Sequence, residues 1–102
     1  MEIGVLITGD RQIRKINKRF LKHDFATDVI SFGLDDAGHC GDVVVSVDTA
    51  RRAAKELKIP FREELARYLV HGTLHLLGYK DKKKKDHERM HRRQEKLLSQ
   101  VL

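Results

Sequence analysis

The stretch FREELARYLVHGTLHLLG, residues 61–78, decides how this chain folds. Glu63 and Glu64 fall in the first turn of a predicted helix, where the helix dipole favours negative charge. Gly78 is a typical residue just beyond a helix end. A helix that is apolar on nearly all sides is buried, so the sequence predicts a central helix around which the other elements pack. Its apolar residues are Leu65, Leu69, Val70, Leu74, Leu76 and Leu77.

The rest of the chain has the periodicities of short strands and amphipathic helices. Strands are predicted at residues 3–8, 28–32 and 43–45, and the consecutive valines of the third indicate a strand covered on both faces. Helices are predicted after Asp10, from Thr49 to Leu57 after Asp48, and from the charged loop at 80–86 to the C-terminus. Asp10 and Asp48 are expected N-caps. The element order predicts an α+β fold of α/β type, a small mixed sheet packed with helices. The last helix has the expected inner face Met90, Leu97, Leu98 and Val101.

Length and composition indicate one domain, residues 1–102, in a reducing compartment. A chain of 102 residues fits one core. Cys40 is the only cysteine, so no internal disulfide is expected, and a cytoplasmic location is predicted. No apolar run reaches the roughly 18 residues of a membrane span, and the first residues lack the layout of a signal peptide. The net charge of +6 makes a polyanion the natural partner, either nucleic acid or an anionic membrane face. Of these two, RNA is the predicted partner, and no membrane partner is expected.

The central helix carries a candidate metal site. His71 and His75 are four residues apart, so both imidazoles project from one face of the helix. Gly78 allows the chain to turn, and Asp81 can then approach as a third ligand. Two histidines and one carboxylate leave a fourth position for water, as in a catalytic zinc site. The sequence therefore predicts one bound metal ion, Zn²⁺, held by His71, His75 and Asp81.

The spacing is that of the long zinc-protease motif H-E-x-x-H-x-x-G-x-x-H, with two differences. Gly72 stands in the place of the glutamate that acts as general base, and Asp81 in the place of the third histidine. The scaffold of a metallohydrolase is thus present without the protease base. A metallopeptidase-like hydrolase is accordingly the third of three functional hypotheses.

Two other readings of the histidines remain open. His71 and His75 could be core histidines satisfied by hydrogen bonds, and His87 could replace Asp81 as the third ligand. Residues 87–91 also spell H-E-x-x-H, but lysines precede them and arginines follow, so cations would crowd a dication. This segment is polar, whereas a zinc helix is normally buried.

The motif resembles that of the YbeY family, bacterial endoribonucleases of rRNA maturation. The family pattern H-G-x-L-H-L-x-G-Y-D-H matches residues 71–79 directly. Residues 27–32, TDVISF, resemble the family's T-D-V-L-S-F strand, and residues 41–46, GDVVVS, resemble its G-D-I-V-I-S strand. Three motifs in the same order and spacing cover most of the chain.

The resemblance implies a small mixed sheet, a central helix with two metal ligands, and a zinc ion held by three histidines. It also implies cytoplasmic work on ribosomal RNA and the ribosome, in 16S rRNA maturation and ribosome quality control. The third histidine of the pattern falls on Asp81, and Lys80 replaces its aspartate. The strand and helix with which family members usually begin are expected to be absent from residues 1–102.

The leading hypothesis is a metal-dependent endoribonuclease with an unassigned general base. Basic side chains are expected to hold the RNA backbone through its phosphates. The second hypothesis is a non-catalytic RNA- or ribosome-binding module that keeps the metal site. The candidate phosphate-binding residues are Arg51, Arg52, Lys82, Lys83, Lys84 and Lys85.

Overall fold

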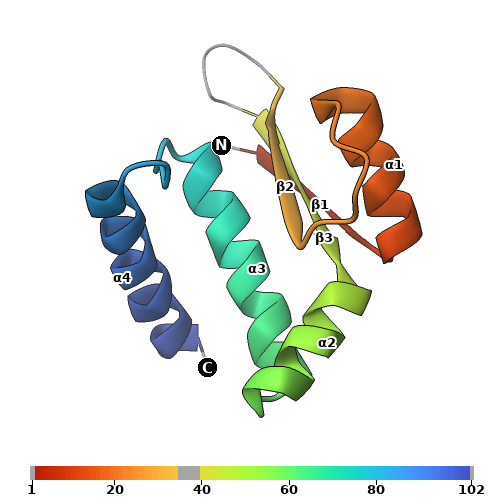
Figure 1. Cartoon of the computed structure of the whole chain (residues 1–102). Coiled ribbons are helices and arrows are strands. Elements are labelled where there is room, and N and C mark those ends of the chain that lie inside the picture. Colours follow the sequence, from red (N-terminus) through yellow and green to blue (C-terminus); the bar gives the residue numbers. More distant parts are fainter. Residues whose placement is uncertain (1, 35–39, 102) are drawn as a thin grey trace.

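A computed structural model describes residues 2–34 and 40–101. Residues 35–39 of the predicted loop at 33–41 lie outside the described part. None of the helices in the described residues is long and apolar enough to cross a membrane. The elements, labelled in Figure 1, are β1 (Glu2–Thr8), α1 (Asp10–Leu21), β2 (Val29–Gly33), β3 (Cys40–Ser46), α2 (Val47–Leu57), α3 (Phe61–Leu76) and α4 (Lys84–Val101).

The three strands form one mixed sheet in the order β1-β3-β2. β3 lies in the middle, parallel to β1 and antiparallel to β2. The consecutive valines of β3 are all at most 5% exposed, which confirms the prediction of a strand covered on both faces. β1 is an edge strand, and Val5 and Ile7 keep about half of their surface exposed, 54% and 51%.

Helices pack on both faces of the sheet, and α3 contacts it more extensively than α1 does. α1 packs on one face and α3 on the other, while α4 packs on the side of α3 away from the sheet (Figure 1). Side chains of β3 alternate between the two cores: Val43 and Val45 pack with Tyr68 of α3, and Val44 packs with Ile13 of α1. The central helix predicted from residues 61–78 is therefore present as α3, but Leu77, predicted among its buried residues, is 57% exposed because it lies just beyond the helix end.

The close approach of α3 to the sheet depends on Gly72. A Cβ atom placed there would lie 2.6 Å from Val43 Cγ1 and 3.0 Å from both Ser31 Oγ and Val29 Cγ2. The Ser31 hydroxyl donates a hydrogen bond of 2.8 Å to the Gly72 carbonyl oxygen. Glycine thus lets the helix backbone touch the strands, which sets the position of the histidines one residue before and three residues after it.

One predicted boundary and one predicted core residue of the last helix are wrong. α4 begins at Lys84, so the charged loop is shorter than the predicted range 80–86. Val101 is 72% exposed because it lies in the last turn of α4. The buried stripe of that helix consists instead of Met90, Gln94 and Leu98.

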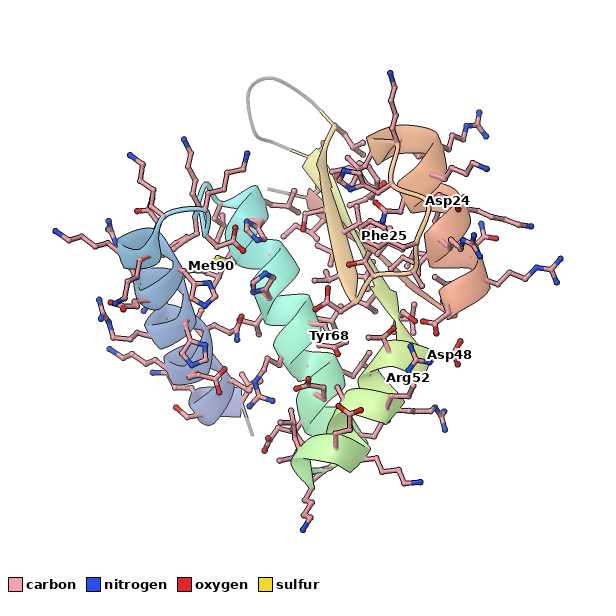
Figure 2. All side chains as sticks on the ribbon, in the orientation of Figure 1. Asp24, Phe25, Asp48, Arg52, Tyr68 and Met90 are labelled. Carbon is pink, nitrogen blue, oxygen red and sulfur yellow. The ribbon has the colours of Figure 1, made fainter. Side chains whose placement is uncertain are left out.

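The predicted helix caps are also wrong. Asp48 accepts a hydrogen bond at the start of α1, and Asp10 accepts hydrogen bonds at the start of α2. Asp48 Oδ2 accepts a hydrogen bond from the Asp10 backbone N–H at 2.8 Å, at the start of α1. The N-cap of α2 is Ser46, whose Oγ accepts from the Thr49 N–H. Asp10 Oδ1 accepts from the hydroxyls of Ser46 and Thr49, and Arg52 lies 2.7 Å from Asp10 Oδ2. Figure 2 shows Asp48 and Arg52 at this junction.

Asp10→Asn is expected to lower the free energy of unfolding at neutral pH by on the order of 1 kcal/mol, after allowance for solvent screening. Hydrogen bonds from Arg52, and then from Ser46, lower the pKa of Asp10 to about 2. Because this pKa lies below that of the unfolded chain, the carboxylate stabilises the fold above the unfolded value of about 3.9. That contribution disappears as the pH falls toward 2.

Urea midpoints of both proteins, measured from neutral pH down to the lowest pH at which both fold, test this prediction. The difference between the two proteins should shrink with falling pH. A difference that is the same at every pH would show that the Asp10 charge does not stabilise the junction.

Candidate metal centre

The end of α3 and the loop after it place the three predicted ligands together. His71 and His75 lie one turn apart on α3. Gly78 has a φ of 99°, in the left-handed region, and the Tyr79 N–H donates to the Leu74 carbonyl oxygen at 3.0 Å. The chain therefore folds back over the helix end, and Asp81 comes beside the histidines.

One ligand atom from each of the three side chains lies at a corner of a small triangle. The two Nε2 atoms of His71 and His75 are 3.1 Å apart. Asp81 Oδ2 lies 3.8 Å from Nε2 of His71 and 3.4 Å from Nε2 of His75. Ligands about 2.0–2.1 Å from a tetrahedral zinc ion lie roughly 3.3 Å from one another, so the spacing fits one such ion.

The hydrogen bonds of both rings turn lone pairs toward the centre of this triangle. His75 Nδ1 lies 3.0 Å from the Tyr79 carbonyl oxygen, which only accepts, so Nδ1 carries the proton. His71 Nδ1 lies 2.8 Å from Gln94 Oε1 and is likewise the donor. In the neutral rings both Nε2 atoms are then unprotonated and face a carboxylate oxygen. Three electron-rich atoms at this distance repel one another unless a metal ion, or a proton shared by two of them, lies between them, so the donor set fits a metal ion.

The site is open on one side. The side chains of His71, His75 and Asp81 are 29%, 30% and 36% exposed. A bound ion with three protein ligands would therefore have room for a water molecule or a substrate oxygen, which is typical of a catalytic rather than a structural centre.

The alternative third ligand, His87, does not join this group. Within the described residues, His71, His75 and Asp81 are the one set of three potential ligands whose ligand atoms all lie within 4.8 Å. His87 and His91 instead line a pocket of about 140 Å³ beside His71, together with Met90 and Gln94. The H-E-x-x-H sequence of α4 is therefore placed next to the candidate centre without forming a second one.

The candidate RNA-binding residues fall into two groups. Lys82 and Lys83 lie in the loop directly after Asp81, and Lys84 and Lys85 form the first turn of α4; all four are exposed. Arg52 binds Asp10, and the Arg51 guanidinium lies 4.8 Å from the ring centroid of Phe61. Phe61 begins α3, about 15 Å along the helix from His71, so the two arginines lie away from the candidate centre. The four lysines flank it.

Gln94 was not among the site residues predicted from the sequence. It is 5% exposed and contacts a candidate ligand directly. The available signal was a polar residue at the middle of the spacing Met90, Gln94, Leu98, where helical periodicity predicts an apolar side chain.

Fold and site together define a class: a small α+β protein with a helix-borne histidine pair and a loop carboxylate, arranged for a metal ion. A family model described as Endoribonuclease YbeY matches residues 1–102. The chain belongs to the YbeY family.

Individual relatives agree with this assignment. The chain is 44% identical over 98 residues to Endoribonuclease YbeY of Porphyromonas gingivalis W83, covering 95% of this chain and 65% of the relative. It is 46% identical over 96 residues to Endoribonuclease YbeY of Aquifex aeolicus, covering 90% and 64%. The solution structure of TM1509 from Thermotoga maritima matches with a TM-score of 0.74 at 29% identity, over 97% of this chain and 67% of that one.

The chain spans only part of these relatives. It covers 65%, 36% and 52% of the lengths of those from Porphyromonas gingivalis W83, Myxococcus xanthus and Anaeromyxobacter.

Proposed function

We propose that residues 1–102 form one metallohydrolase domain, a zinc-dependent endoribonuclease that acts on ribosomal RNA in the cytoplasm. The observation that carries this proposal is the convergence of His71, His75 and Asp81 in a chain of the YbeY family. The family name supports cleavage of RNA, and the proposed biological setting is 16S rRNA maturation and ribosome quality control.

His71, His75 and Asp81 would hold the ion. When bound, the ion would supply Lewis-acid chemistry, a lowered pKa of a bound water and polarisation of a phosphoryl oxygen. The Nδ1 protons of both rings, donated to Gln94 and to the Tyr79 carbonyl, keep the Nε2 atoms available. The exposed lysines at 82–85 would hold RNA phosphates beside the centre, which positions the chain without reading its sequence. The general base is not assigned.

A second candidate function, a non-catalytic RNA- or ribosome-binding module, is supported by the net charge of +6 and the same lysines. The third, a metallopeptidase-like hydrolase, is disfavoured by the packing of Gly72. A side chain at this position would point into Val43 and Val29 of the sheet. A glutamate there could not serve as a base at the metal.

Single-stranded RNA incubated with the purified chain and zinc is expected to be cleaved. A chelator should stop the cleavage, zinc should restore it, and His71→Ala should lack it while still binding RNA. Gel electrophoresis of end-labelled RNA measures cleavage, and a filter assay measures binding. RNA binding without cleavage in any divalent metal would favour the binding module. Chelator-sensitive casein turnover without RNA cleavage would favour the peptidase.

A further inference from the structure

Gln94 occupies a place on α4 where packing alone calls for an apolar residue. It lies one turn from Met90 and one turn from Leu98, which are 1% and 4% exposed, and is itself 5% exposed. Figure 2 shows Met90 on the side of α4 that faces α3. Burying an amide costs free energy unless each polar atom finds a partner. The partners of Gln94 therefore indicate what the residue does.

Both polar atoms of Gln94 have partners, and these fix the orientation of the amide. Its Nε2 donates to Glu95 Oε2 at 3.0 Å, and an ionised carboxylate only accepts. Oε1 must then face His71 Nδ1, 2.8 Å away. An acceptor at that position requires the proton of the neutral ring to be on Nδ1, which leaves the Nε2 lone pair directed at the candidate metal position.

Arg67 of α3 holds the carboxylate that orients Gln94. Its Nε and Nη2 donate to the two oxygens of Glu95, each at 3.0 Å, and its Nη1 donates to the buried Glu64 at 2.7 Å. The guanidinium lowers the pKa of the Glu95 carboxyl, so this acceptor stays ionised at neutral pH. The contacts form one continuous chain from Glu64 through Arg67, Glu95 and Gln94 to His71.

The two candidate histidines are thus held by different means. The ring of His75 donates to the backbone carbonyl oxygen of Tyr79, an acceptor that any residue at position 79 would provide. The ring of His71 depends on one side chain from another helix. Hydrogen bonds of this kind fix the tautomer and orientation of metal-binding histidines, and their loss typically costs about 10- to 100-fold in metal affinity.

We propose that Gln94 is the positioning residue of the metal centre. It sets the tautomer and ring orientation of His71, and the Arg67–Glu95 pair sets the orientation of Gln94. This inference rests on the proposed metal site, which it deepens by assigning the role of a residue on α4.

Three variants test the proposal. Gln94→Met keeps the volume and removes the acceptor. Gln94→Glu made together with Glu95→Gln keeps an acceptor for Nδ1–H and avoids placing two carboxylates in contact. Gln100→Met places the same change at an exposed position of the same helix. Zinc affinity is measured by competition with a chromophoric chelator. The tautomer of His71 in the zinc-free protein is read from its ¹⁵N shifts by NMR at a mildly alkaline pH, and urea midpoints of the zinc-free proteins report the fold.

Gln94→Met is expected to bind zinc about 10- to 100-fold more weakly and to lose the Nδ1–H tautomer of His71. The double variant Gln94→Glu, Glu95→Gln should recover most of the affinity, and Gln100→Met should match the unchanged protein. A Gln94→Met protein that keeps both the affinity and the tautomer would overturn the proposal, as would one that loses only stability. If Gln94→Met does not fold, the proposal stands or falls on Glu95→Leu, which removes both acceptor oxygens beside Gln94 Nε2 and should shift the tautomer population toward Nε2–H. If the unchanged chain binds no zinc, the proposed function fails, and the NMR result still decides the role of Gln94.

Discussion

Replacing His75 with alanine is expected to reduce bound zinc from about one ion per chain to almost none. His75 Nε2 is the ligand atom nearest to both others, at 3.1 Å from His71 and 3.4 Å from Asp81. The two atoms that remain are 3.8 Å apart and would leave half of a tetrahedral shell without protein ligands. RNA cleavage should disappear with the metal.

Elemental analysis of purified, tag-free protein measures this effect. The matched control is His23→Ala, which also removes one histidine but lies beside Phe25, away from the candidate centre. The control should keep its zinc and its activity. Full zinc content in His75→Ala would show that the histidine pair is structural, and no zinc in either protein would shift the case to the RNA-binding module.

The second large effect is expected in stability. Gly72→Ala should lower the free energy of unfolding by about 1–3 kcal/mol, the typical cost of an overpacked core. The added methyl would meet Val43 Cγ1 at 2.6 Å, and Val43 is fully buried in the central strand. The gain in helix propensity, about 1 kcal/mol for alanine over glycine, offsets part of the clash. Gly72→Val adds two more methyl groups and should not fold stably.

Urea unfolding, followed by the circular dichroism of the helices, gives the measurement. Gly33→Ala is the control, since a Cβ at Gly33 meets nothing within 4 Å, and its midpoint should stay close to that of the unchanged chain. An equal or higher midpoint for Gly72→Ala would mean that α3 can move off the sheet at little cost. Zinc affinity measured on the same sample would show whether such a movement reaches His71 and His75.

The sequence predicted the features that depend on local spacing. The apolar residues of segment 61–78 predicted the central helix, and the three valines of β3 predicted a strand covered on both faces. The three candidate ligands were found for the same reason, because residues 71–81 form one helix end and one turn. The structure brings these three together; that they bind zinc stays a prediction.

The features that the sequence did not predict depend on pairs distant along the chain. Asp10 and Asp48 are each good cap residues, and only the arrangement of α1 against α2 makes each serve the other helix. Gln94 could be recognised as misplaced in an apolar stripe, but its partner His71 lies 23 residues away on another helix. The ion pair between Arg52 and Asp10 likewise joins residues far apart along the chain, and a role of Arg52 in RNA binding stays a prediction.

Asp81 differs from the two histidines in how it is held, which affects how readily this candidate ligand could be replaced. His71 and His75 are fixed through Gly72 to the sheet and through Gln94 to α4, so altering either disturbs packed neighbours. Asp81 lies on the loop between α3 and α4, with 36% of its side chain exposed. Exchanging this candidate ligand between carboxylate and imidazole would therefore leave the packed scaffold unchanged, and would alter the preference of the proposed site for harder or softer ions.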